Sequence, residues 1–115
     1  MENKDLAMTI ANLLDEKKAV DIKVIDIAEK SSFADYFVNA SAGSIRQLSA
    51  LSKDVEEKFF ENGIETKNVE GKPESGWILI DGGDVIVNLF TLDVRDKYTL
   101  DKIWNDCETI IIENR

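Results

Sequence analysis

The sequence predicts an α+β domain in which helices cover one face of a mixed β-sheet of about five strands. Segments with the apolar spacing of helices and segments with that of strands follow one another in the order α-β-β-α-β-β-β-α. The 115 residues, 43% of them hydrophobic, suffice for a core without metals or disulfides. Because no repeat, linker or low-complexity segment interrupts this order, we expect residues 1–115 to form a single domain.

The first two expected helices carry apolar stripes at spacings of three and four residues. The stripe of the first helix, over residues 4–18, consists of Leu6, Ala7, Ile10, Leu13 and Leu14. The second helix begins at Ser44, which fits a capping box with Gln47. Its stripe consists of Ile45, Leu48, Leu51, Val55 and Phe59. Asn62 and Gly63 then provide a good C-terminal cap.

Two strands are expected between these helices, and a third is expected after the second helix. Residues 20–28 first alternate between apolar and polar side chains and then become more continuously apolar. This pattern indicates a strand buried on both faces. Residues 36–41 form the second strand, and residues 65–69 form a short third one. Residues 70–76 are expected to be a loop that contains the only proline.

A β-hairpin over residues 76–90 is the centre of the predicted sheet. Two apolar runs flank Gly82 and Gly83, and a Gly-Gly pair supplies the positive φ angles of a two-residue hairpin turn. If these glycines form the turn, Asp81 faces Asp84. The other pairs follow by counting and are Ile80 with Val85, Leu79 with Ile86, Ile78 with Val87, and Trp77 with Asn88.

The two sides of this hairpin differ in composition, because side chains alternate across a strand. One side is aliphatic and suited to a core: Ile78, Ile80, Val85, Val87 and Leu89. The other side mixes aromatic, aliphatic and acidic groups: Trp77, Leu79, Asp81, Asp84, Ile86, Asn88 and Phe90. Large apolar groups ringed by charge are typical of a partner-binding patch. The alternative is that another element of the chain covers Trp77 and Phe90 and leaves only the turn in water.

Beyond the hairpin the sequence predicts a connection and a last helix. The connection covers residues 91–98, and its Arg95 is expected to form a surface ion pair. The helix opens at Thr99 or Asp101 and carries Leu100, Ile103, Trp104 and Cys107. Residues 109–115 suit either an extended end or a final turn packed on the core.

The composition narrows the possible functions. Without histidine, the chain forms neither Ser-His-Asp nor Cys-His arrangements, nor any histidine metal site. Its formal charge of −9 disfavours bare nucleic acid and anionic membranes and favours a basic protein as partner. The single cysteine, Cys107, has no internal disulfide partner and is expected to be a buried apolar side chain. The first five residues lack the sections of a secretory signal, so we expect a cytoplasmic protein that binds neither DNA nor a membrane.

Two residues at the start of the second expected helix raise an enzymatic interpretation. Gly43 and Ser44 invite comparison with nucleotidyltransferases, whose Gly-Ser turn precedes a strand with alternating carboxylates that hold two metal ions. No such Asp-x-Asp pair follows here, and Asp81 and Asp84 form an incomplete shell for a cation. We therefore expect no catalytic residue, metal or cofactor. A nucleotidyltransferase-class enzyme acting with magnesium and nucleotide is the alternative.

Short motifs run through the chain from about Leu6 to Trp104. They are Ala34-Asp35-Tyr36-Phe37-Val38, Ser44 to Gln47, Glu70-Gly71, Trp77-Ile78-Leu79-Ile80-Asp81, Gly83-Asp84-Val85-Ile86-Val87, Phe90, Arg95, Tyr98-x-Leu100 and Trp104. In this order and spacing they resemble the ribosomal silencing factor family, also called RsfS or Iojap-like. The resemblance implies a mixed-sheet domain related to the nucleotidyltransferase fold but without its catalytic acids, and a non-enzymatic repressor of translation.

The resemblance also implies a partner. Members of that family bind the fourteenth protein of the large ribosomal subunit, a basic protein on the intersubunit face, and so block joining of the small subunit. A role in large-subunit biogenesis and homodimer formation are also associated with the family. This chain departs from the family at two positions, since Gly82 stands where a tyrosine is usual and Asn88 where a histidine is usual.

The residues expected to contact the partner are Glu70, Lys72, Trp77, Leu79, Asp81, Asp84, Asn88 and Tyr98. The indole of Trp77 and the side chain of Leu79 would supply desolvated contact area. The three carboxylates would pair with arginine or lysine of the partner. Lys72 would reach acidic or backbone groups, and Asn88 would keep a hydrogen-bonding group on this side of the sheet. Tyr98 either lies beside these residues or is buried.

Overall fold

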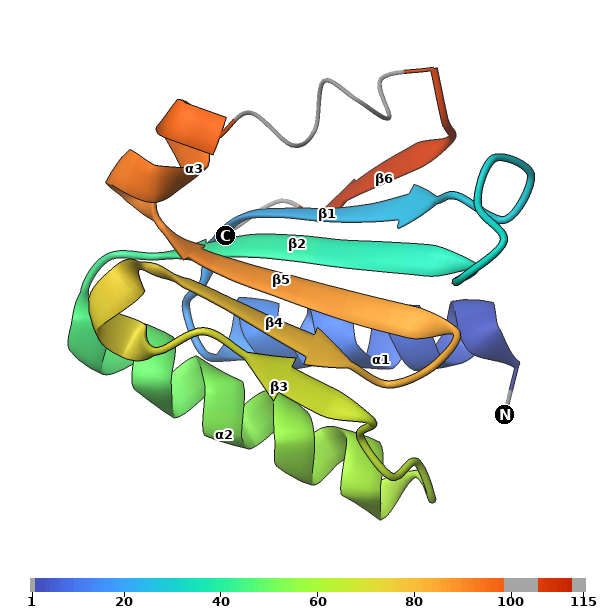
Figure 1. Cartoon of the computed structure of the whole chain (residues 1–115), viewed down its shortest axis with the longest axis horizontal. Coiled ribbons are helices and arrows are strands. Elements are labelled where there is room, and N and C mark those ends of the chain that lie inside the picture. Colours follow the sequence, from blue (N-terminus) through green and yellow to red (C-terminus); the bar gives the residue numbers. More distant parts are fainter. Residues whose placement is uncertain (1, 99–105, 113–115) are drawn as a thin grey trace.

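The computed structural model describes residues 2–98 and 106–112, which contain three α-helices, a short 3-10 helix and six β-strands (Figure 1). In chain order the elements are α1 (Asn3–Glu16), β1 (Val20–Asp26), β2 (Tyr36–Ala42), α2 (Ile45–Glu61), β3 (Asn68–Glu70), η1 (Pro73–Ser75), β4 (Trp77–Asp81), β5 (Val85–Thr91), α3 (Leu92–Tyr98) and β6 (Thr109–Ile112).

The strands form one mixed sheet in the order β3-β4-β5-β2-β1-β6. β2 and β5 are parallel, while all other neighbours are antiparallel. The predicted α+β class and mixed sheet are therefore confirmed. The described residues form one strand more than the five expected, because β6 pairs with residues 22–25 of β1. This pairing shows that residues 109–112 are an extended end rather than a final turn.

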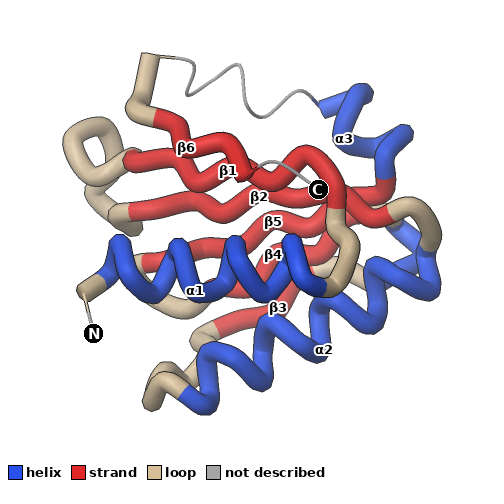
Figure 2. Tube along the Cα trace, turned by 180° about the vertical axis from the view of Figure 1, so that it is seen from behind, coloured by secondary structure: helices blue, strands red, loops and turns tan. Residues whose placement is uncertain are grey.

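Helices α1 and α2 cover the same face of the sheet, as the view from behind shows (Figure 2). Apart from Ile45, which is 49% exposed, and the half-buried Leu13, their apolar stripes meet the aliphatic side of the hairpin in one buried core. To this core β4 and β5 contribute Ile78, Ile80, Val85, Val87 and Leu89. Burying an aliphatic side chain of this size contributes about 1.5–3 kcal/mol. This core confirms the predicted placement of helices on the aliphatic face.

The start of α2 is fixed by side-chain hydrogen bonds. The hydroxyl of Ser44 accepts a hydrogen bond from the backbone N–H of Gln47 at 3.1 Å, as a capping box requires. The return bond goes one residue earlier than in that motif, since the Gln47 side-chain oxygen accepts from the N–H of Gly43 at 2.7 Å. Gln47 also donates to the carbonyl of Lys18 at 3.2 Å and thereby ties α2 to the chain just after α1.

The hairpin has a different register from the one predicted. The backbone N–H of Gly82 donates to the carbonyl of Val85 at 3.0 Å, so the turn is made by Gly83 and Asp84. Gly83 has a φ of +95°, as the first central residue of a type II′ turn requires. The side chain of Asp81 accepts a hydrogen bond from the N–H of Gly83 at 2.8 Å. This bond stabilises a turn at Gly83 and Asp84 in place of the turn expected at Gly82 and Gly83.

The cross-strand pairs of β4 and β5 differ from the predicted ones because the turn lies elsewhere. Asp81 lies opposite Ile86 rather than Asp84, and Trp77 lies opposite Phe90 rather than Asn88. The remaining pairs are Ile80 with Val87, Leu79 with Asn88, and Ile78 with Leu89. Because the register moved by two residues, every strand residue keeps the side predicted for it.

The other differences concern element boundaries. β3 begins at Asn68, later than the expected strand over residues 65–69. Residues 92–98, expected as a connection, form α3. Its Val94 occupies the space beside Gly76, where an added Cβ would lie 2.6 Å from Val94 Cγ2, so a tertiary contact supports this short helix. The helix expected from Thr99 or Asp101 lies mainly outside the described residues. No helix within the described residues is both long and apolar enough to cross a membrane.

Candidate protein-binding face

The side of β3, β4 and β5 that faces away from α1 and α2 carries the candidate site (Figure 1). We call it the Trp77 face, and it consists of Asn68, Glu70, Trp77, Leu79, Asp81, Ile86, Asn88 and Phe90. Its exposure is graded across the strands. The β5 residues Ile86, Asn88 and Phe90 are buried, whereas the β4 residues are half-buried and the β3 residues are exposed. The face is therefore neither fully open nor sealed, and its accessible part lies on β3 and β4.

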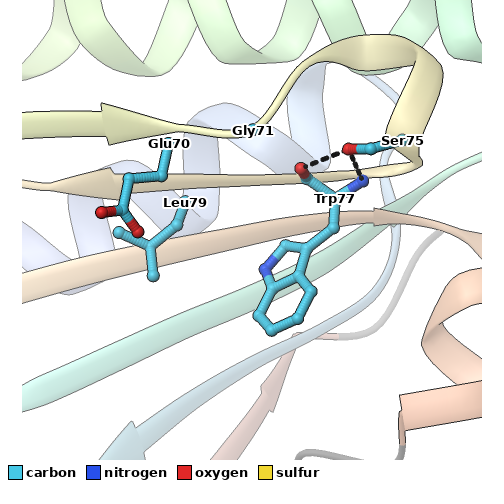
Figure 3. A pocket seen from close by; sticks show the side chains of 5 residues that line it. All are labelled: Glu70, Gly71, Ser75, Trp77 and Leu79. Atoms are coloured by element: carbon cyan, nitrogen blue, oxygen red, sulfur yellow. Dashed lines mark hydrogen bonds between the residues drawn. The ribbon is translucent and has the colours of Figure 1, made fainter.

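A shallow pocket of about 330 Å³ opens on this accessible part (Figure 3). Its lining residues are Glu70, Gly71, Ser75, Trp77 and Leu79. The indole and the leucine side chain provide apolar surface, and the carboxylate of Glu70 lies beside Leu79 (Figure 3). The pocket thus combines an aromatic group, an aliphatic group and a negative charge, which suits a cationic side chain with an apolar stem.

The backbone around the pocket is fixed by two local features. Gly71 has a φ of +92°, and a Cβ there would lie 2.2 Å from the carbonyl oxygen of Trp77. Only glycine permits this approach. The hydroxyl of Ser75 donates to the Trp77 carbonyl at 3.1 Å and accepts from its N–H at 3.4 Å (Figure 3).

The indole of Trp77 is held by two neighbours on β5. Its N–H donates to the side-chain oxygen of Asn88 at 3.2 Å. Its ring packs on Phe90, with 5.3 Å between ring centroids and 36° between ring planes. Aromatic pairs at such distances contribute about 0.5–1.5 kcal/mol beyond the area they bury. The ring is half-buried as a result and still reaches the pocket.

Two buried asparagines support this arrangement: Asn88, which was expected at the contact, and Asn39, which the sequence did not single out. Asn88 donates from its side-chain nitrogen to the side-chain oxygen of Asn39 on β2 at 3.0 Å, and both residues are buried. Asn39 and Asn88 are direct partners in the parallel β2–β5 ladder. The signal in the sequence is an asparagine in the middle of an apolar strand, where a polar side chain has to find a partner.

The prediction that Arg95 lies at the surface was wrong. Arg95 is 8% exposed, and its guanidinium lies over the ring of Phe90, with 5.7 Å from Cζ to the centroid. It donates to the hydroxyl of Ser41 at 3.1 Å and pairs with Asp21 at 3.5 Å. The expected ion pair exists, but α3 places the guanidinium against the sheet, where it covers the ring of Phe90. Phe90 is therefore covered by another element, as the alternative interpretation of this side of the hairpin expected. Trp77 is only half-buried, so that interpretation is correct for it only in part.

The charged residues of the predicted site are spread over strand, turn and loop. Glu70 is exposed and accepts a hydrogen bond from the side chain of Asn68 at 2.8 Å. Asp81 is half-buried and caps the turn, whereas Asp84 is exposed within the turn, so the expected facing pair is not formed. Lys72 is exposed in the loop before η1 and is not one of the residues that line the pocket.

Tyr98 ends α3, and its side chain lies outside the described residues, so its predicted contact stays a prediction. Among the residues that the structure describes, no group of three or more cysteine, aspartate or glutamate residues is arranged to hold a metal ion.

The fold and this face define a class: a small acidic α+β protein with two long helices on one side of a mixed sheet and an aromatic, acidic surface on the other. The family model described as RsfS, ribosomal silencing factor during starvation, matches residues 1–115. The chain therefore belongs to the ribosomal silencing factor family, as the motifs of its sequence indicate.

Individual relatives agree with this assignment. A ribosomal silencing factor RsfS of Bacillus subtilis is 38% identical over 106 residues, which are 92% of this chain and 90% of that protein. A crystal structure of a protein from Chromobacterium violaceum has a TM-score of 0.87 and 30% identity, with 91% of this chain and 88% of that chain covered. A mouse protein named for mitochondrial assembly of the ribosomal large subunit is 29% identical over 83% of this chain and 43% of that protein. The implied relation to the nucleotidyltransferase fold stays a prediction.

Proposed function

We propose that this chain is a cytoplasmic silencing factor that binds the large ribosomal subunit and blocks joining of the small subunit. The fourteenth large-subunit protein, which is basic, is the proposed contact. Membership of the RsfS family supports the silencing role. The name of the mouse relative supports the choice of the large subunit.

The Trp77 face is the observation that carries this proposal. It presents a half-buried indole and Leu79 next to the carboxylates of Glu70 and Asp81. An aromatic anchor with a charged rim is the arrangement that concentrates binding energy in protein interfaces. The carboxylates and the net charge of −9 complement a basic partner and favour rapid encounter with it.

The proposed mechanism is steric and involves no chemical step. A chain of 12.9 kDa on the intersubunit face would occupy space that the small subunit needs. Asp81 and Asp84 lie in a strand and in a turn, and they do not form the alternating pair on one strand that two-metal catalysis uses. We therefore propose a non-enzymatic factor without a cofactor, and the nucleotidyltransferase alternative rests on Gly43 and Ser44 alone.

A second role in large-subunit biogenesis is compatible with the same contact, and the name of the mouse relative favours it. A factor seated on the intersubunit face of an immature large subunit would also prevent its premature joining. A homodimer through the Trp77 face would compete with this contact, so dilution of the protein would then increase binding to the ribosome.

Co-sedimentation with purified ribosomal particles tests the proposal. The protein should sediment with isolated large subunits but not with joined ribosomes, and an excess of it should prevent joining. Trp77→Ala should weaken binding by about thirtyfold, which is typical for loss of an aromatic anchor. Phe60→Ala is the matched control, because Phe60 is 79% exposed on α2, which covers the opposite face. Binding that Trp77→Ala leaves unchanged would contradict the proposal.

A further inference from the structure

Asn39 and Asn88 form a buried pair of amides in a part of the sheet that apolar side chains could fill. They are 1% and 4% exposed, and their neighbours on the same side of β5, Ile86 and Phe90, are apolar. Replacing two bonded polar partners with apolar groups of similar shape is often neutral for stability. The two amides therefore do more than fill space in the sheet, because they make directional hydrogen bonds.

The direction of these bonds follows from the indole. An indole N–H donates and never accepts, so the Asn88 atom that faces Trp77 must be its oxygen. The amide nitrogen of Asn88 is then turned toward β2, where it donates to the oxygen of Asn39. Within the described residues, every buried side-chain nitrogen and oxygen has a hydrogen-bond partner. The chain of bonds is thus complete only when the indole takes one orientation.

We propose that Asn39 and Asn88 are positioning residues for the docking surface, which hold the indole of Trp77 in its binding orientation. The hydrogen bonds cross from β2 through β5 to β4 and fix the half-buried indole from beneath the surface. Asn39 is buried too deeply to touch a partner, and it acts on the indole through Asn88. This inference rests on the proposed function, because it assigns a role in the same contact.

The expected effect on affinity is moderate. A preorganised side chain spares the partner the cost of ordering it on binding. Loss of the two amides should therefore weaken binding to large subunits by about threefold to tenfold, the factor for ordering one large side chain. Loss of the indole itself should weaken binding more strongly, by about thirtyfold.

The test compares three proteins, all with Trp104→Phe so that Trp77 is the only tryptophan. The first is otherwise unchanged, and the second carries Asn39→Leu and Asn88→Leu. The third carries Asn12→Leu, the same exchange at an exposed position of α1 behind the sheet. Thermal melting first shows which variants are folded. If the double leucine variant does not fold, Asn39→Val with Asn88→Val replaces it, since valine suits a strand.

Two readouts are needed, the NMR order parameter of the Trp77 indole N–H in the free protein and the affinity for purified large subunits. In the double variant the order parameter should fall from near that of rigid backbone, about 0.85, toward that of a flexible group, about 0.6, and the affinity should fall as stated above. The Asn12→Leu protein should match the parent in both.

An unchanged order parameter in the double variant would overturn the inference. So would a lowered order parameter with unchanged affinity, if Trp77→Ala does weaken binding. If Trp77→Ala leaves binding unchanged, the proposed function fails instead, and the positioning role at a docking surface fails with it. The order parameter still reports in that case whether the amides hold the indole.

Discussion

Gly82 in the hairpin leaves room for the ring of Phe59 in α2. A Cβ at position 82 would lie 2.4 Å from Cε1 of that ring, closer than side-chain atoms approach each other. Gly82 does not have a positive φ, in contrast to Gly83. The glycine is therefore required for packing against α2 rather than for a permissive turn. A larger side chain at this position could not take the same direction without moving Phe59.

We expect Gly82→Ala to destabilise the fold by about 1–3 kcal/mol, the usual cost of overpacking. Urea unfolding of the two single variants and the double variant with Phe59→Leu measures this cost. The smaller leucine should absorb part of the clash, so the double variant should lose less stability than the sum of the single losses. Strictly additive losses would show that Phe59 is not the cause.

Arg95 should matter for stability well beyond a surface ion pair. Arg95→Met keeps the apolar stem but removes the hydrogen bond to Ser41 and the charge over Phe90, so we expect a loss of about 1.5–3 kcal/mol. Asp21→Asn should cost less than about 1 kcal/mol, because the Asp21 side chain is 50% exposed and its pairing is screened. Asparagine also tolerates the φ of +53° at this position. Thermal melts of both variants test the ranking, and equal losses would contradict it.

Tyr36 should make stability dependent on pH only in the alkaline range. Burial raises the pKa of its phenol above the ordinary 10.0, and the carboxylates of Asp26, Asp35, Glu108 and Glu2 raise it further. A raised pKa in the folded state means that this stability is fully present below pH 10 and is lost as the pH rises through the folded pKa. Near neutral pH, Tyr36 does not make the free energy of unfolding depend on pH.

Absorbance titration of a Tyr98→Phe protein, in which Tyr36 is the only tyrosine, should show ionisation above the ordinary pKa of a free tyrosine. Tyr36→Phe should remove this contribution to alkaline unfolding while acid unfolding stays the same. Ionisation at or below the free value would contradict the effect of burial and of the four carboxylates on the phenol.

The charge of Glu70 should act on the rate of association. Glu70→Lys places a positive charge on the pocket rim, so the association rate with large subunits should fall at low salt. The effect should shrink as salt is raised, because exposed charges are screened. Glu57→Lys, at an exposed position of α2, makes the same change in net charge behind the sheet and should have a smaller effect. Equal effects of the two variants would assign the rate to net charge alone.

How far the sequence predicts this structure depends on the range of the interactions involved. The two sides of the hairpin could be predicted because side-chain alternation is local and survives a register shift of two residues. The register itself could not, since it depends on the Asp81 side chain capping the turn. α3 and the buried Arg95 depend on contacts with Gly76 and Ser41, which are distant in sequence, as well as on the nearby ring of Phe90.

The candidate site was predictable to a similar extent. Trp77 and Leu79 could be selected because their strand carries aromatic and acidic groups on one side. Asn39 could not, because its role appears only when the parallel pairing of β2 and β5 places it beside Asn88. The graded exposure of this side, with Phe90 buried and Trp77 half-buried, likewise depends on where α3 packs.

NMR mapping with the isolated fourteenth large-subunit protein tests the docking face most directly. On addition of this proposed partner, the signals of the Trp77 indole and the Leu79 methyl groups should shift, while those of Ile45 and Leu13 on the two helices should stay in place. The opposite pattern, with changes on α1 and α2 and an undisturbed indole, would contradict the assignment of the Trp77 face as the surface that meets the ribosome.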